Sequence, residues 1–280
     1  MNVGYVVPVR NEEASLPDFL DSLSRQENSK IGTSRQLVFV PNGCEDRSEE
    51  LLSQYCADRQ EMSFVLTTGR TGIIGAFRAG IQALASCDFF GKLDADICLD
   101  PTSLDSLEKC LKADLRVKAA YCEPLPFDGT VDFLETEFGQ PIPYGERTYL
   151  EGRACLYRGN PFQGFAQNDS RLEQLQCEDI FLSALFYTRY GLSAIRSAGT
   201  IEFRPPTSRL DYTRMLRRTI REIERVRTEF PELAEALDVL DRPILDEDAA
   251  NLALQIANNE VDLESGWPRL ESTKGGRPLI

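Results

Sequence analysis

The 280-residue sequence contains no histidine. This absence excludes imidazole acid–base catalysis, Ser-His and Cys-His nucleophile systems, and the usual zinc sites that contain histidine. If the protein is an enzyme, we therefore expect its catalytic base to be a carboxylate. We expect any bound metal ion to be a hard cation that takes oxygen ligands.

The sequence also lacks a long apolar stretch. The longest one, around residues 181–187, is well short of the about 20 residues needed to cross a bilayer. The residues after Met1 form neither a basic region nor a cleavage site, so we expect no signal peptide and no membrane span. The eight cysteines are scattered singly and form no CxxC pair. This usage favours a reduced, cytoplasmic setting over a disulfide framework.

Positive charge is scarce. The 31 lysines and arginines face 45 aspartates and glutamates, which gives a formal net charge of −14. Such a balance argues against a nucleic-acid partner, because phosphate contacts need a basic surface. With 42% hydrophobic and 27% charged residues, the composition is that of a soluble globular protein.

Between residues 3 and 190, short β-branched segments alternate with amphipathic ones. The pattern predicts strands at residues 3–9, 37–40, 63–67, 89–93 and 117–122, and helices that include 16–23, 51–55, 72–86, 104–115 and 177–190. This alternation indicates an α/β fold with a mostly parallel sheet. Polar clusters at residues 11–13, 42–43 and 94–96 each follow a strand, and ligands of such sheets bind beyond the carboxyl ends of the strands.

One polar cluster carries two carboxylates separated by a single residue, in the segment Asp94-Ala95-Asp96. The two side chains can bind one divalent cation, or divide between a sugar hydroxyl and a metal, and Mg²⁺ and Mn²⁺ prefer such oxygen ligands. A solvated turn with two acids is the alternative for this short pattern. Its position directly after a strand, like two other polar clusters, favours a site.

Several segments, in their order along the chain, resemble family 2 glycosyltransferases of the GT-A fold. They are VVPVRNEE at 6–13, VFVPNGCEDRS at 38–48, GAFRAGI at 75–81, KLDAD at 92–96, GRACLYR at 152–158 and EDIFL at 178–182. The resemblance implies a Rossmann-like, mostly parallel sheet flanked by helices. It also implies a catalytic domain over 1–204, with a nucleotide-sugar-binding half (1–100) and an acceptor-binding half (101–204). Residues 205–280 match no part of the family pattern and are expected to form a C-terminal helical extension.

The resemblance also implies roles for individual residues. Asp179 is the expected base for the acceptor hydroxyl, with Glu178 beside it, and Asp96, with Asp94, is expected to bind Mn²⁺ or Mg²⁺. The nucleotide sugar is expected to contact Pro8, Arg10, Glu12, Asn42, Arg78, Asp94, Ala95 and Asp96. The residues expected near the acceptor or the diphosphate are Gly152, Arg153, Arg214 and Arg218.

The predicted function is that of a metal-dependent glycosyltransferase that moves a sugar from a nucleoside-diphosphate sugar to a small or carrier-bound acceptor, with inversion. A homodimer is compatible with the sequence. Two alternatives stay open, a nucleotidyltransferase of similar α/β layout and a non-catalytic sugar-nucleotide-binding protein. The turn at Pro41-Asn42 supports the second, since it replaces two acids common in the family. The arginines at 214–225 form either a solvated helix face or a patch for the donor diphosphate, an anionic acceptor or a membrane.

Overall fold

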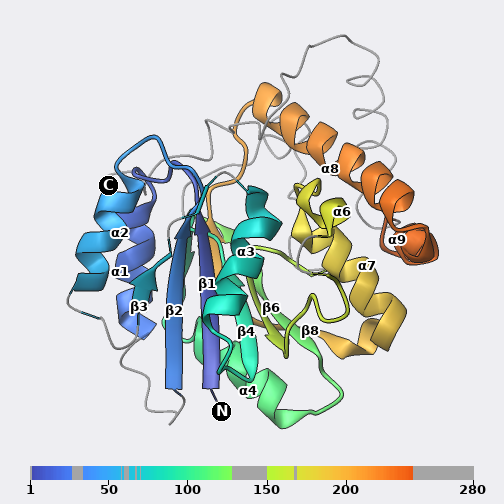
Figure 1. The fold of residues 1–280 in the computed structure, drawn as a ribbon, viewed down its shortest axis with the longest axis horizontal. Coiled ribbons are helices and arrows are strands. Elements are labelled where there is room, and N and C mark those ends of the chain that lie inside the picture. The colour runs from blue at the N-terminus through green and yellow to red at the C-terminus, as the bar shows by residue number, and fades with distance from the viewer. Residues whose placement is uncertain are drawn as a thin grey trace.

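The computed structural model describes residues 2–26, 34–57, 59, 63–66, 68–69, 71–127, 150–166 and 169–241. Much of the irregular stretch at 123–149 and the part of the C-terminal extension beyond residue 241 therefore lie outside the described residues. The described strands form one eight-stranded sheet of order β3-β2-β1-β4-β7-β6-β8-β5. The prediction of an α/β fold with a Rossmann-like, mostly parallel sheet flanked by helices is confirmed (Figure 1).

The first half of the sheet is parallel. It contains β1 (Asn2–Val9), β2 (Ser34–Pro41), β3 (Ser63–Val65) and β4 (Phe89–Leu93). In the second half, β7 (Ala154–Arg158) runs antiparallel to both β4 and β6 (Ala119–Pro126). Strand β8 (Ile195–Phe203) pairs parallel with β6 and antiparallel with β5 (Ile97–Leu99). Because β1, β2 and β4 are parallel neighbours, the polar clusters that follow them lie at one edge of the sheet.

Helices cover both faces of the sheet (Figure 1). Helices α1 (Leu16–Gln26), α2 (Ser48–Ala57) and α4 (Ser103–Ala113) contribute to one hydrophobic cluster, while α3 (Gly72–Ala83) and α7 (Glu178–Tyr190) contribute to the other. Alternate residues of β1 supply the two clusters, with Val6 in one and Tyr5 and Val7 in the other. This division follows from the period of two in a strand.

The C-terminal helices pack on the outside of α7. They are α8 (Arg209–Glu229) and α9 (Ala234–Asp241), and the short α6 (Ser170–Glu173) lies nearby (Figure 1). Val226 and Phe230 are fully buried in the cluster that also contains Phe181, whose ring centroid lies 4.8 Å from that of Phe230. The described part of the expected helical extension therefore shares a hydrophobic core with α7.

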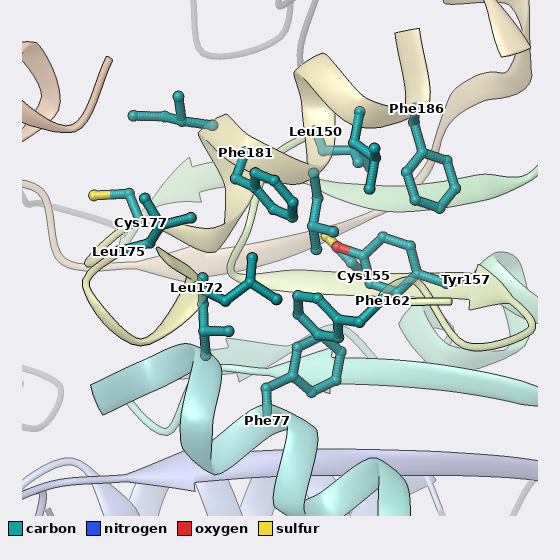
Figure 2. Packing of buried hydrophobic residues seen from close by; sticks show 14 of the residues in the cluster. Phe77, Leu150, Cys155, Tyr157, Phe162, Leu172, Leu175, Cys177, Phe181 and Phe186 are labelled. Atoms are coloured by element: carbon teal, nitrogen blue, oxygen red, sulfur yellow. The ribbon is translucent and has the colours of Figure 1, made fainter. Parts of the chain in front are cut away.

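Beneath α7, aromatic rings fill the space between helix and sheet. Figure 2 shows Phe77 of α3 next to Phe162, and Tyr157 of β7 next to Phe186 of α7. The two pairs of ring centroids are each 5.5 Å apart. These contacts hold α7, and with it Glu178 and Asp179, against the second half of the sheet.

Most of the predicted elements form, with shifted ends. The helix expected at 72–86 ends at Ala83, and the strand expected at 117–122 runs from Ala119 to Pro126. Strands β5 and β8 were not predicted from the sequence. Strand β5 has only three residues, and β8 has an irregular burial pattern without clear alternation, so neither shows the periodicity on which the prediction relied.

Candidate active site

The turns that follow β1 and β2 are bonded to each other. Asn11 adopts a left-handed backbone conformation with φ 55°, which is uncommon outside glycine. Its Oδ1 accepts a hydrogen bond from the backbone N–H of Glu45 at 2.8 Å. The hydroxyl of Ser48 accepts one from the backbone N–H of Glu12 at 2.7 Å. The two polar turns therefore form one unit at the carboxyl edge of the sheet.

Glu12 and Asn42 are both buried, and the side chain of each accepts a hydrogen bond from a residue that lies directly before or at the start of a helix. The Glu12 carboxylate accepts a hydrogen bond from the Ser15 hydroxyl at 2.7 Å, directly before α1. The Asn42 amide oxygen accepts from the backbone N–H of Thr71 at 2.7 Å and lies 3.3 Å from its hydroxyl. Asn42 therefore fixes the start of α3, and its amide N–H groups are the part of this side chain suited to a ligand.

The centre of the site is a buried lysine in β4. Lys92 is 1% exposed, and its Nζ lies 2.6 Å from Asp94 Oδ1 and 2.5 Å from Glu178 Oε1. It also donates a hydrogen bond to the Gly152 carbonyl at 3.0 Å. One ammonium group thus joins the acidic segment after β4, the loop before β7 and the start of α7.

Gly152 lies directly against the two acids of α7. A Cβ atom at this position would lie 2.8 Å from Asp179 Cβ, closer than real Cβ atoms come, and 3.0 Å from Glu178 Oε1, which is also a tight contact. The absence of a side chain therefore allows the loop to approach the start of α7. The same loop is also bonded to the segment after β4, because the carbonyl of Arg153 accepts a hydrogen bond from the Asp94 backbone N–H at 2.7 Å.

Burial and crowding of negative charge raise several pKa values here. Burial, more than the proximity of Asp179 and Asp94, raises the pKa of Glu178 to about 7, although Lys92 opposes the shift. Burial and the neighbouring Glu151 raise the pKa of Asp179, opposed by Lys92 and by Arg218 of α8. Raised carboxylate pKa values in a cluster of this kind are typical of functional sites.

The second acid of the Asp94-Ala95-Asp96 segment is also affected. Burial and the nearby Asp94 raise the pKa of Asp96 to about 6, with Arg153 and Lys92 opposing. Within the described residues, no group of three or more potential metal-ligating side chains is present. Two close carboxylates fit a hard divalent cation that takes its other ligands from outside the chain.

The model of the family "Glycosyl transferase family 2" matches residues 5–146, which is half of the chain. The chain belongs to glycosyl transferase family 2. The prediction made from the ordered motifs is therefore confirmed at the level of the family.

The similar sequences are bacterial. Over 107 residues the chain is 34% identical to undecaprenyl-phosphate 4-deoxy-4-formamido-L-arabinose transferase of Pectobacterium atrosepticum, covering 38% of this chain and 32% of that protein. Over 109 residues it is 36% identical to the protein of that name from Pseudomonas aeruginosa, covering 38% and 31%. The chain thus matches about a third of the length of these relatives.

Similar solved structures are glycosyltransferases. The mannosyltransferase PcManGT of Pyrobaculum calidifontis, in complex with GDP-Man and Mn²⁺, has a TM-score of 0.61 at 15% identity and covers 92% of this chain and 76% of its own. Glucosyl-3-phosphoglycerate synthase of Mycobacterium tuberculosis has a TM-score of 0.54 at 18% identity, with coverages of 81% and 79%. At these identities the likeness supports the fold. No helix within the described part of the family 2 chain is long and apolar enough to cross a bilayer.

The family 2 resemblance placed further residues near the nucleotide sugar, and the structure gives each a position. Pro8 pairs with Val40 within the sheet, and Arg10 follows the end of β1. Ala95 is buried between the two acids. The Arg78 guanidinium donates a hydrogen bond to the Ala166 carbonyl, so in this structure it holds the segment before α6. Its placement near the ribose or diphosphate stays a prediction.

The predicted acceptor-side residues divide between two places. Gly152 and Arg153 lie beside the acidic cluster, where Arg153 forms an ion pair with the buried Glu151 and stacks on the Phe203 ring at 4.1 Å. Arg214 of α8 pairs with Asp211 of the same helix at 3.5 Å. Arg218 lies close enough to Asp179 for its charge to oppose the rise in the pKa of that carboxyl.

Two residues of this site, Lys92 and Glu151, are not among those predicted from the sequence. Lys92 belongs to the KLDAD segment, and Glu151 lies in no predicted motif. A charged residue inside the otherwise apolar strand FFGKL is a usable signal, because buried lysines are almost always paired. The importance of Glu151 depends on its proximity to Asp179, which is distant in sequence and is brought close by the fold.

Proposed function

We propose that this protein transfers a sugar from a nucleoside-diphosphate sugar to an acceptor, with inversion and with Mn²⁺ or Mg²⁺. The single observation that carries the proposal is the position of Lys92, which contacts both Asp94 and Glu178. It links the acidic pair suited to a metal-bound diphosphate with the acidic pair suited to the acceptor. Family 2 membership supports this reading over a nucleotidyltransferase.

In this proposal residues 1–100 bind the donor and residues 101–204 bind the acceptor, with 205–280 as the helical extension. The bonded turns after β1 and β2, together with the start of α3, form the wall that receives the nucleotide. Asn42 presents its amide N–H groups there. Asp94 and Asp96 would hold the cation, which supplies positive charge to the departing diphosphate.

Asp179 is the proposed base. It accepts the proton of the acceptor hydroxyl while the oxygen attacks the anomeric carbon, and the bond from that carbon to the diphosphate oxygen breaks. The nucleoside diphosphate leaves with the electron pair of that bond. The raised pKa of Asp179 suits this role, because a base works best when its pKa approaches the working pH.

The names of the relatives and of one structural neighbour indicate two kinds of acceptor. The bacterial relatives are named for transfer to undecaprenyl phosphate, and the mycobacterial neighbour was solved with phosphoglyceric acid. We propose a small or carrier-bound acceptor for this chain.

The full chain should be incubated with UDP-, GDP- and dTDP-sugars in the presence of Mn²⁺, and free nucleoside diphosphate measured. We expect slow hydrolysis of one donor. Pyrophosphate release from a nucleoside triphosphate would instead identify a nucleotidyltransferase, and binding without hydrolysis or transfer would identify a non-catalytic protein.

The Asp96→Ala variant tests the metal site. We expect it to weaken Mn²⁺-dependent binding of the nucleoside diphosphate by about tenfold or more, since a charge-assisted ligand is lost. Asp238→Ala, at an exposed position of α9, is the matched control and should leave binding unchanged. Equal binding by Asp96→Ala and wild type would remove Asp96 from the metal site.

A further inference from the structure

Helix α8 is rich in positive charge within an acidic chain. Its 21 residues, RLDYTRMLRRTIREIERVRTE, contain seven arginines and four acids, whereas the whole chain has a formal net charge of −14. The helix runs along the outside of α7 (Figure 1). A local excess of arginine creates a positive potential that attracts a ligand or partner of negative charge.

The helix is fixed to the segment that leads into Glu178 and Asp179. Glu222 is 1% exposed, and its Oε1 accepts hydrogen bonds from the backbone N–H groups of Gln176 at 2.6 Å and Cys177 at 3.1 Å. The Arg225 guanidinium donates to the Gln174 carbonyl. These contacts set the position of α8 relative to the start of α7.

Arg218 lies one helical turn before Glu222, on the same side of α8. Since Glu222 contacts Gln176 and Cys177, this spacing places Arg218 beside the first turn of α7. Its charge opposes the rise in the pKa of both Cys177 and Asp179, which agrees with that position. Arg218 therefore reaches the acceptor side of the site from a helix outside the sheet.

The Arg218 side chain has an unused donor. Its Nε is buried and has no hydrogen-bond partner in the described part of the structure. Leaving such a donor unsatisfied is unfavourable, and a bound acceptor oxygen would satisfy it. Arg214, by contrast, is already paired with Asp211.

We propose that Arg218 binds a phosphate group of the acceptor beside Asp179. This inference rests on the proposed function and specifies its acceptor. A guanidinium presents a planar fork of donors that matches phosphate oxygens. A phosphate also carries more charge and more acceptor oxygens than a neutral hydroxyl. It can therefore bind near Glu151 and Asp179 only where a cation such as Arg218 offsets their repulsion.

The phosphate could belong to a soluble phosphorylated metabolite or to a prenyl phosphate lipid. Two matched pairs of probes separate these sources: glycerol 3-phosphate against glycerol, and farnesyl phosphate against farnesol. Binding to the full chain is measured by calorimetry with Mn²⁺ and a saturating nucleoside diphosphate, which occupies the donor side. We expect one phosphate probe to bind at least tenfold more tightly than its phosphate-free match.

Arg218→Met should weaken the binding of that phosphate probe by roughly 10- to 100-fold. Arg218→Lys should recover part of the loss, because the charge returns without the fork. Arg221→Met removes the same charge from an exposed position of α8 and should change binding less than twofold. Affinity for the nucleoside diphosphate, measured separately, should stay within twofold in all three variants.

The inference is overturned if neither phosphate probe binds more tightly than its phosphate-free match. It is also overturned if Arg218→Met and Arg221→Met weaken binding of the phosphate probe equally, or if Arg218→Met weakens binding of the nucleoside diphosphate instead. In each of these cases, Mn²⁺-dependent nucleotide binding by the wild-type chain would leave the proposed function standing. Failure of the wild-type chain to bind a nucleoside diphosphate in the presence of Mn²⁺ would contradict the proposed function.

Discussion

On the β1–β2 side of the candidate site, Asn11 and Asn42 accept hydrogen bonds from backbone N–H groups, whereas on the β4–α7 side a buried lysine makes ionic contacts with two acids. Asn42 bonds to Thr71, and Asn11 bonds to Glu45. On the other side Lys92 contacts Glu178, a residue far along the chain. In the proposed function the first side receives the nucleotide, and the second side supplies the charged groups that take part in the reaction.

The largest expected effect is on catalysis, from a change on the β4–α7 side of the site. Asp179→Asn keeps the shape of the side chain and removes its ability to accept the acceptor proton. We expect kcat to fall by about 10²- to 10⁴-fold, with donor binding nearly unchanged. Steady-state transfer assays and nucleotide titration measure the two quantities. Asp238→Asn is the exposed control, and unchanged turnover in Asp179→Asn would remove Asp179 from the role of base.

The next effect is on stability. Lys92→Met leaves Asp94 and Glu178 without their shared buried counter-charge, and breaking such a pair costs about 3–5 kcal/mol. Urea unfolding at pH 8 should show this loss, and the loss should shrink at pH 5, where protonation of Glu178 removes its buried negative charge. Lys118→Met is the control, because the Lys118 ammonium bonds to the Leu115 carbonyl and lies 5.9 Å from the Tyr190 ring centroid, with no carboxylate among these contacts. An equal loss at both pH values would contradict the electrostatic explanation.

The raised pKa of Glu178 makes the folding stability depend on pH, and the sign of this dependence follows from the direction of the shift. Between about pH 4.5 and 7 the folded protein retains a proton on Glu178 that the unfolded chain releases. The unfolded state therefore binds fewer protons, and the stability contributed by this group falls as pH rises through this window. The shift to about 7 corresponds to a loss on the order of 3 kcal/mol.

Glu178→Gln removes the titrating group and should flatten that fall. Comparison of urea midpoints for wild type and variant from pH 4.5 to 8 measures the difference. Glu235→Gln, the same change at an exposed position, is the control. If the wild type and Glu178→Gln keep parallel pH profiles, Glu178 does not titrate in this range.

The smallest effect is expected from a change on the β1–β2 side of the site. Asn42→Ala leaves the Thr71 backbone N–H without its acceptor, at a cost of about 1–2 kcal/mol. Asn42→Asp restores an acceptor near the start of α3, where a negative charge is favourable. Its stability should lie within about 0.5 kcal/mol of wild type. Urea unfolding separates the two variants, and an equal loss in both would show that the hydrogen bond is not what Asn42 contributes.

The sequence by itself predicted the strand and helix alternation, the polar clusters at the strand ends and the family. These features are local, since a strand, the turn after it and the following helix are written in adjacent residues. The Asp94-Ala95-Asp96 segment could be recognised for the same reason. The ends of elements and the short or irregular strands β5 and β8 could not, because their pairing is set by partners elsewhere in the chain.

Only the tertiary structure decided how the charges meet. The contacts of Lys92 with Gly152 and Glu178 join residues 60 and more positions apart, and no local pattern specifies them. The same is true of Glu222, which places Arg218 beside the start of α7. Buried ionic contacts depend on which side chains share one low-dielectric space, and that is a property of packing. The sequence therefore determined the parts of the site, and the fold determined the electrostatics that connect them.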